Sequence, residues 1–181
     1  MKNYSLLVLV LLFSSATFAQ SYIGIKVSKT DYDIEVYDGE SWDDPNGFGI
    51  YGGYNLNENL AIELAYDDFG DSNDNIDPKW TISGSAISAV AIAKAPLNNG
   101  FTLYGKLGVS RYDLELDVNG SPDPSSGIFG NISDDGTELT YGAGVRYEAS
   151  EQIGLRLEYV FVDGDDSVKP STLSIALEYL L

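Results

Sequence analysis

The sequence predicts an all-β protein, an eight-stranded antiparallel up-and-down transmembrane β-barrel. Apolar residues alternate with small or polar residues in eight runs. Short and long connections alternate between these runs. One face of each run is apolar, with aromatic residues near its ends. After residue 19, no window has the apolar period of an amphipathic helix.

The composition excludes most classes of enzyme. The 181 residues contain no Cys and no His, which removes thiolate catalysis, Cys-ligated zinc and every His-based triad. We therefore expect no catalytic residue, no metal site and no cofactor. The formal net charge of -18 argues against nucleic acid as a partner, because its phosphates would be repelled. The content of 44% apolar residues is too high for a disordered acidic tail.

The first 19 residues have the features of a secretory signal peptide. Lys2 precedes an apolar run from Leu6 to Phe13, and the small residues Thr17 and Ala19 precede the expected cleavage site. The apolar run is much shorter than the roughly 20 residues of a membrane-spanning helix. We expect residues 1–19 to be removed on export and residues 20–181 to form a single outer-membrane barrel domain.

Each of the eight runs is expected to form one strand, because its side chains alternate between two faces. In the first run, Ile23 and Ile25 alternate with Gly24 and Lys26. The runs cover approximately residues 23–28, 47–56, 60–66, 80–93, 101–110, 139–147, 153–161 and 173–181. The fourth run is the least regular, and its apolar face is predicted to carry Trp80, Ile82, Val90 and Ile92.

The connections between the runs predict the two ends of the barrel. Three are tight turns, at residues 57–59, 95–100 and 149–151. Four are long, at about residues 29–46, 67–79, 113–138 and 162–172. Short turns at one end and long loops at the other are typical of outer-membrane barrels. Alternation also continues through residues 31–36 and 113–118, which predicts β structure beyond the membrane.

The contents of the two faces indicate which face meets lipid. The polar face carries too few charges for a solvated exterior, which argues against a soluble barrel with an apolar interior. We expect its charged residues to pair in a narrow lumen, at Lys26, Glu63, Lys106, Arg146, Arg156, Glu158 and Glu178. The apolar face is expected to carry two aromatic girdles, with Phe48, Tyr66, Trp80 and Phe161 at the outer end and Tyr54, Phe101, Tyr147 and Tyr179 at the inner end.

Several short motifs resemble the eight-stranded membrane domain of OmpA-type proteins. They are YGAGVRY at 141–147, GLRLEY at 154–159, the last strand at 173–181, PLNNG at 96–100 and LYGKLG at 103–108. The resemblance covers essentially the whole mature chain. It implies a monomeric barrel in the outer membrane of a Gram-negative bacterium, inserted by the barrel-assembly machinery. It also implies a lumenal ion pair between Arg156 and Glu63.

Three features depart from that family. The sequence ends at Leu181, so the peptidoglycan-binding domain of the long family members is not expected. The family usually ends in Phe, so Leu181 implies a weaker assembly signal. Arg146 stands where the family's second, switchable ion pair has an acid, which argues against gating by that pair.

Two functions remain open from the sequence. The first is a structural barrel that presents acidic loops to partners outside the cell. The second is a narrow channel for ions or small solutes, favoured by inward glycines of the second run that would leave room for water. Lumen-facing Tyr51 and Tyr104 argue against the channel, because they would fill much of the interior.

The acids point to a charged outer rim. Of the 28 acids, 21 lie within the four long connections, at residues 31–44, 67–77, 113–135 and 163–166. They form either a solvated face or a site for divalent cations beside lipopolysaccharide. Residues 71–75 begin like a calcium loop, but Ile76 and Ile82 stand where that motif needs glycine and glutamate. The expected partners are therefore outer-membrane lipid and lipopolysaccharide, without a specific calcium loop.

Overall fold

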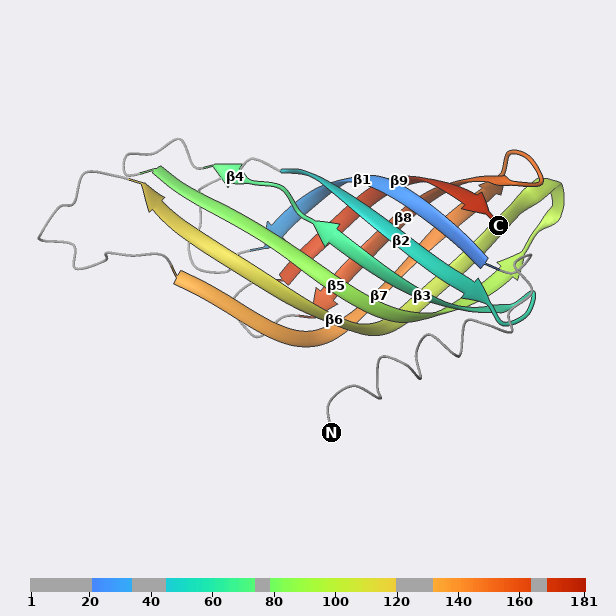
Figure 1. The fold of residues 1–181 in the computed structure, drawn as a ribbon, viewed down its shortest axis with the longest axis horizontal. Helices are drawn as coiled ribbons and strands as arrows, with labels where there is room; N and C mark the ends of the chain where they lie inside the picture. The colour runs from blue at the N-terminus through green and yellow to red at the C-terminus, as the bar shows by residue number, and fades with distance from the viewer. Residues whose placement is uncertain (1–20, 34–44, 74–78, 120–131, 164–168) are drawn as a thin grey trace, which may run out of the picture.

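The computed structural model describes residues 21–33, 45–73, 79–119, 132–163 and 169–181, so the expected signal peptide lies outside the described residues. Eight long strands form one closed antiparallel barrel, which confirms the predicted fold (Figure 1). The strands are β1 (Ser21–Asp33), β2 (Asn46–Asn55), β3 (Leu60–Asp68), β5 (Lys79–Pro96), β6 (Phe101–Asn119), β7 (Ile132–Glu148), β8 (Ile153–Asp163) and β9 (Lys169–Leu180). The two-residue strand β4 (Ser72–Asn73) pairs with β5.

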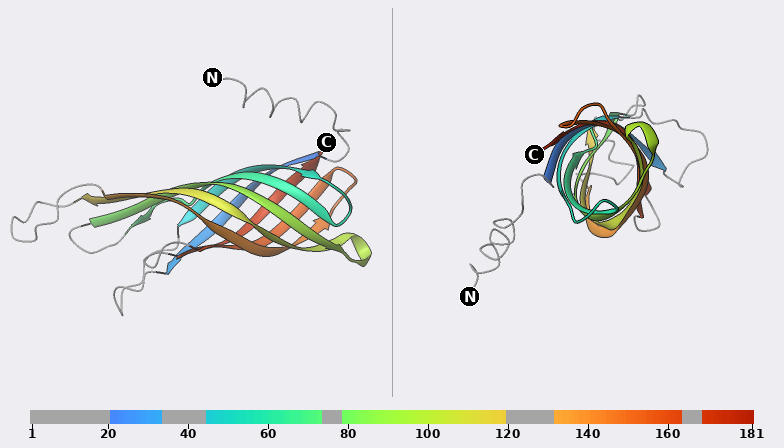
Figure 2. Two further views of the ribbon diagram at one scale, coloured as in Figure 1. Left: turned by 90° about the horizontal axis from the view of Figure 1, so that it is seen from below. Right: turned by 90° about the vertical axis from the view of Figure 1, so that its right-hand side faces the viewer.

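Two pairings close the sheet into a barrel. β1 pairs with β9 from Tyr22–Leu180 to Asp33–Lys169, and β3 pairs with β5 from Leu60–Ala93 to Asp68–Ser85. Viewed along the barrel, the strands form a complete ring (Figure 2). Closure satisfies backbone N–H and C=O groups between strands, which a bilayer interior requires. In the described part of the chain, no helix has the length and apolar character needed to cross a membrane.

The short turns lie at one end, beside the C-terminus (Figure 1). They join β2 to β3, β5 to β6 and β7 to β8, as the sequence predicts. The turn before β6 includes the 3-10 helix η2 (Asn98–Gly100), where Asn99 and Gly100 have φ angles of 64° and 78°. Asn and Gly enter this left-handed region at the lowest cost, so the turn depends on these two residue types.

At the other end, β5, β6 and β7 extend past the remaining strands (Figure 1). β6 pairs with β5 as far as Asn119–Lys79 and with β7 as far as Leu116–Ile132. The predicted extension of β6 is therefore confirmed for the backbone. β1 continues to Asp33, and residues 34–36 of its predicted extension lie outside the described residues. The sequence missed the early start of β7, because residues 132–138 were assigned to the long connection rather than to the strand.

In seven strands, the predicted apolar face points outward and the predicted polar face lines the lumen. The prediction is wrong for the fourth run, which is β5. Val90 and Ile92 are buried in the lumen, whereas Ile87, Ala89 and Ala91 are exposed. β5 carries alanines on its lipid face and branched residues inside, so apolar content does not distinguish its faces. The side chains of Trp80 and Ile82 lie outside the described residues.

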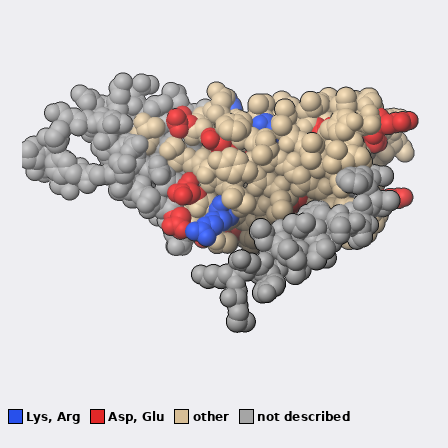
Figure 3. Space-filling model, in the orientation of Figure 1, with Lys and Arg blue, Asp and Glu red and all other residues tan. Residues whose placement is uncertain are grey.

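Aromatic side chains gather at both ends of the lipid face. The exposed ones include Phe48, Tyr66 and Phe161 toward the long connections, and Phe101, Tyr147 and Tyr179 toward the short turns, with Tyr54 half-buried. The sequence analysis missed two further members, Tyr141 and Tyr159. Their ring centroids lie 5.3 Å and 4.7 Å from that of Phe161. On the face that Figure 3 shows, the surface between the ends carries few charged groups, and acids lie toward both ends.

Candidate functional site

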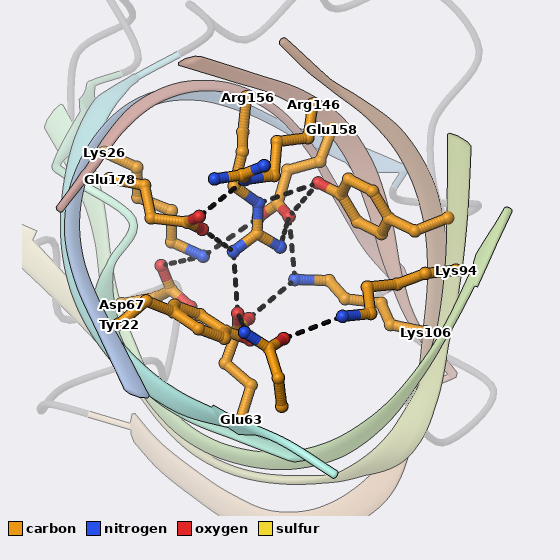
Figure 4. Close-up of polar contacts among 12 residues, drawn as sticks. Tyr22, Lys26, Glu63, Asp67, Lys94, Lys106, Arg146, Arg156, Glu158 and Glu178 are labelled. Carbon is orange, nitrogen blue, oxygen red and sulfur yellow. Dashed lines mark hydrogen bonds and ion pairs between the residues drawn. The ribbon is translucent and has the colours of Figure 1, made fainter. Parts of the chain in front are cut away.

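Arg156 lies at the centre of a charge network that crosses the lumen (Figure 4). Alternation along β8 points it inward. Its Nη1 lies 2.7 Å from Glu63 Oε2 and 3.4 Å from Glu178 Oε2. Its Nη2 lies 3.2 Å from Glu158 Oε2. Three carboxylates thus surround one buried guanidinium, which is the pairing that a buried charge requires.

Tyrosine rings hold this guanidinium from two sides. The Arg156 Cζ atom lies 4.6 Å from the ring centroid of Tyr51 and 4.8 Å from that of Tyr104, within cation–π range. The Tyr104 hydroxyl accepts a hydrogen bond from Arg156 Nε at 3.1 Å and donates one to Glu158 Oε2 at 2.9 Å. Tyr22 donates to Glu63 Oε2 at 2.9 Å. Arg156 is therefore fixed both in position and in orientation.

Two lysines complete the network on the side of the long connections. Lys106 Nζ lies 3.0 Å from Glu158 Oε2 and 3.6 Å from Glu63 Oε1. Lys26 Nζ lies 2.8 Å from Asp67 Oδ1 and 3.3 Å from Glu158 Oε1. Glu158 therefore contacts three cations, which come from three strands: Lys26 from β1, Lys106 from β6 and Arg156 from β8.

Arg146 extends the network toward the short turns. It is the register partner of Arg156 on the neighbouring strand, so the two guanidinium groups would repel each other. Glu178 lies between them, with Oε1 2.6 Å from Arg146 Nε and Oε2 3.4 Å from Arg156 Nη1. Lys94, also at this end, donates to Asn55 Oδ1 at 2.7 Å.

All seven charged residues assigned to the lumen from the sequence line it and join this network. Two members were missed. Asp67 was counted with the long connections, but it continues the alternation of Glu63 in β3 and makes the eight charges four positive and four negative. Tyr22 precedes Ile23 on the inward parity of β1. Extending the alternation by one step at each site would have found both residues.

The inward glycines do not leave the expected room for water. A Cβ atom at Gly53 would lie 2.2 Å from the Tyr22 ring, and one at Gly24 would lie 2.2 Å from the Tyr51 ring. At Gly49, a Cβ atom would lie 2.7 Å from Lys26 Cε. These glycines make space for the large side chains of the network, so the expectation that they favour a channel is wrong.

The network separates two cavities that share no lining residue. A cavity of about 380 Å³ lies toward the short turns and is lined in part by Tyr22, Lys94 and Arg146. The second, beside Lys26 and Thr140, measures about 30 Å³. In this conformation, side chains interrupt the lumen.

The described residues contain no cluster of three or more acids placed to hold a metal ion. Many acids of the long connections, including those of residues 34–44 and 74–78, lie outside the described residues. The cation hypothesis for the acidic rim therefore remains a prediction. Asp113, Asp135 and Asp163 are exposed rim acids within the described part of the chain.

Comparison with known proteins identifies the family. The family model of the outer membrane protein beta-barrel domain matches residues 5–179. Outer membrane protein A of Shigella flexneri is 28% identical over 174 residues, which cover 88% of this chain and 48% of that protein. The chain spans about half the length of the curated relatives it matches.

Solved structures share the fold. Neisserial surface protein A has a TM-score of 0.65 at 16% identity, covering 89% of this chain and 97% of that chain. Ail, the attachment invasion locus protein of Yersinia pestis, has a TM-score of 0.62 at 18% identity, with coverage of 89% and 97%. With its closed barrel, apolar outer band and family match, this chain belongs to the outer membrane protein β-barrel domain family and is an OmpA-like protein of the outer membrane.

Proposed function

We propose that this protein is a structural component of the outer membrane that presents an acidic surface to partners outside the cell. The charge network carries this proposal. A conducting pore needs a continuous path for water and ions. Here Arg156 and its three carboxylates stand between two cavities, and the outer cavity holds only about 30 Å³.

The acidic rim supports the surface role. β5, β6 and β7 continue beyond the barrel as paired strands, which would hold rim residues in fixed positions. The exposed Asp113 and Asp135 lie on this extension, and Arg111 Nη2 lies 3.2 Å from Asp135 Oδ2. Partners of this surface would be cationic groups, or divalent cations that bridge its acids to lipopolysaccharide phosphates. Catalysis has no part in this function.

A narrow channel is the second candidate. The cavity of about 380 Å³ favours it, because this cavity reaches the short-turn end beside Glu58 and Leu180. The charge network and the side chains around the small outer cavity would then need to move for solutes to pass. The two functions therefore differ in whether Arg156 leaves its carboxylates while the barrel stays folded.

Single-channel recording in planar bilayers separates the two. We expect the wild type to show no steady conductance and Arg156→Ala to open measurable conductance, because the substitution removes the central side chain. Arg111→Ala is the matched control, since it removes an equal charge outside the barrel. Steady wild-type conductance equal to that of Arg156→Ala would favour the channel and reject the structural proposal.

We also propose that export removes residues 1–19 and that the mature barrel, inserted by the assembly machinery, is a monomer. The basic, apolar and small-residue segments at the N-terminus support the processing step. N-terminal sequencing of protein purified from outer membranes should begin at Gln20. A sequence that begins at Met1 would contradict this boundary.

A further inference from the structure

The larger lumenal cavity measures about 380 Å³ and reaches the short-turn end of the barrel. Its volume is within the range of small-molecule binding sites. Ile92, Pro96 and Leu180 contribute apolar walls. Six charged residues also line it, three of each sign, namely Lys94, Arg146, Arg156, Glu58, Glu148 and Glu178. Apolar walls with a few charged groups are typical of sites that bind small molecules.

The acids and the cations of this cavity lie at different depths. Glu58 lies in the turn after β2 and is exposed, and Glu148 is the last residue of β7, with a side chain 48% exposed. Arg146 lies two residues further inside on β7, and its side chain is only 16% exposed. Lys94 is half-buried and lies two residues further inside than Pro96, the last residue of β5. The cavity therefore has acids at its mouth and cations further inside.

Lys94 carries a positive charge that no carboxylate balances within the described part of the chain. Its Nζ donates to the neutral Asn55 Oδ1 at 2.7 Å and forms no ion pair there. The other interior groups are paired, because Arg156 has three carboxylates and Glu178 lies between Arg156 and Arg146. Lys94 therefore adds one positive charge to a network of four cations and four acids. Since a partly buried charge is stabilised by an opposite charge nearby, the interior favours a ligand with one negative group.

The mouth of the cavity favours a positive group. Glu58 and Glu148 are exposed acids there, so a simple anion would be repelled as it enters. Arg146 Nη1 lies 3.8 Å from Glu148 Oε1, which is beyond hydrogen-bond distance. The guanidinium and the carboxylate can therefore each bind a further group of opposite charge. Their separation suits a molecule whose carboxylate and ammonium groups are joined through a single carbon atom.

We propose that this cavity binds a free α-amino acid with an uncharged aliphatic side chain. The carboxylate of the ligand lies toward Lys94 and Arg146, whose side chains point into the lumen (Figure 4), and its ammonium group lies toward Glu148. Ile92 and Leu180 contact the aliphatic side chain. The short turns of an outer-membrane barrel face the periplasm, so the ligand enters from that compartment. Binding needs no path through the Arg156 network and is independent of conductance.

NMR titration of the folded protein in lipid nanodiscs tests the proposal with three related molecules. Valine carries both charges, 3-methylbutanoate carries only the carboxylate, and 2-methylpropylamine carries only the ammonium group. We expect valine to cause saturable shifts at the amides of Ile92 and Thr102, which line the cavity, and none at Thr140 beyond the network. Each analogue should bind about tenfold more weakly, because it loses one charge-assisted contact. No saturable shift with valine, or equal affinity for valine and either analogue, would overturn the proposal.

Two variants assign the contacts. Lys94→Met should weaken valine binding about tenfold, and it leaves no buried carboxylate without a cation, so the barrel should stay folded. Lys29→Met is the matched control, since it removes an exposed lysine from the opposite end of the barrel and should keep the wild-type affinity.

Glu148→Gln should weaken the binding of valine but not that of 3-methylbutanoate, which has no ammonium group. A misfolded barrel would lose both ligands, so this difference reports on the site itself. Wild-type affinity for valine in either Lys94→Met or Glu148→Gln would overturn the proposal. Conductance does not enter this test, so it and the test of the proposed function can fail separately.

Discussion

At the scale of single residues, the charge balance of the lumenal network depends on the Arg156 side chain. Removing this side chain would leave Glu63, Glu158 and Glu178 as neighbouring buried carboxylates with fewer cations to balance them. A broken buried ion pair costs far more than an exposed one, because the remaining charge keeps its desolvation penalty. The stability of the barrel should therefore respond strongly to single substitutions here and weakly to changes on the rim.

We expect Arg156→Met and Glu63→Gln each to lower the free energy of unfolding by about 3–5 kcal/mol. The double variant should lose less than the sum, because the two residues are in contact. Urea unfolding in lipid vesicles measures all four states. Arg111→Gln with Asp135→Asn is the control cycle, with a coupling of about 0.2–1 kcal/mol expected for an exposed pair. Simple additivity at Arg156 and Glu63 would show that they do not interact.

The Tyr104 hydroxyl should have a measurable effect of its own. Tyr104→Phe keeps the ring over Arg156 but leaves Arg156 Nε without its acceptor. We expect a loss of about 1–3 kcal/mol in the free energy of unfolding. Tyr159→Phe removes an exposed hydroxyl that contacts Ser171 Oγ, and it should stay within about 0.5 kcal/mol of the wild type. Equal effects of the two substitutions would contradict the role of the Tyr104 hydroxyl.

At the scale of elements, the long strand β6 joins the membrane barrel to the acidic rim. It is paired on both sides as far as Leu116. Successive residues in this stretch therefore find ladder partners on β5 or β7. Such pairing predicts a rim with low mobility, since opening it requires several hydrogen bonds to break together.

Hydrogen exchange on the protein in detergent checks this expectation. Amides of residues 114–118 in β6 should exchange much more slowly than those of the turn at residues 57–59. The turn supplies an internal reference, because it lies between strands at the opposite end of the barrel. Exchange at residues 114–118 as fast as in the turn would contradict a paired extension.

At the scale of the whole molecule, closure of the sheet into a ring determines how the protein resists unfolding. The pairings of β1 with β9 and of β3 with β5 leave the barrel without the free sheet edges of an open sheet. Denaturant must break several strand pairings together before the ring opens. We therefore expect an isolated hairpin from the chain to be unstable and the complete ring to persist in detergent.

We expect unboiled protein to migrate on a denaturing gel as a compact form distinct from the boiled form. Circular dichroism in the same detergent should show β structure before boiling and lose it afterwards. A scrambled sequence of identical composition is a suitable control, because it keeps the net charge of -18 but not the alternation. Identical mobility before and after boiling, together with no β signal, would argue against a closed barrel.

The local pattern of the sequence determined the eight strands, the short-turn end and the lumenal side of seven strands. Alternation with a period of two acts within each strand, so it can be recognised without knowing the partner strand. Family resemblance added the pairing of Arg156 with Glu63. The prediction of the lipid-facing side failed for β5. Its alanines on one face and branched residues on the other remove the difference in apolar content by which the two faces are told apart.

Only the tertiary structure decided how the network is connected and what fills the lumen. Glu63 and Arg156 are 93 residues apart in the chain and 2.7 Å apart in space. Such contacts depend on how far each strand is shifted when the ring closes, and no local pattern contains that shift. The same shift brings the rings of Tyr22 and Tyr51 over Gly53 and Gly24 inside the lumen.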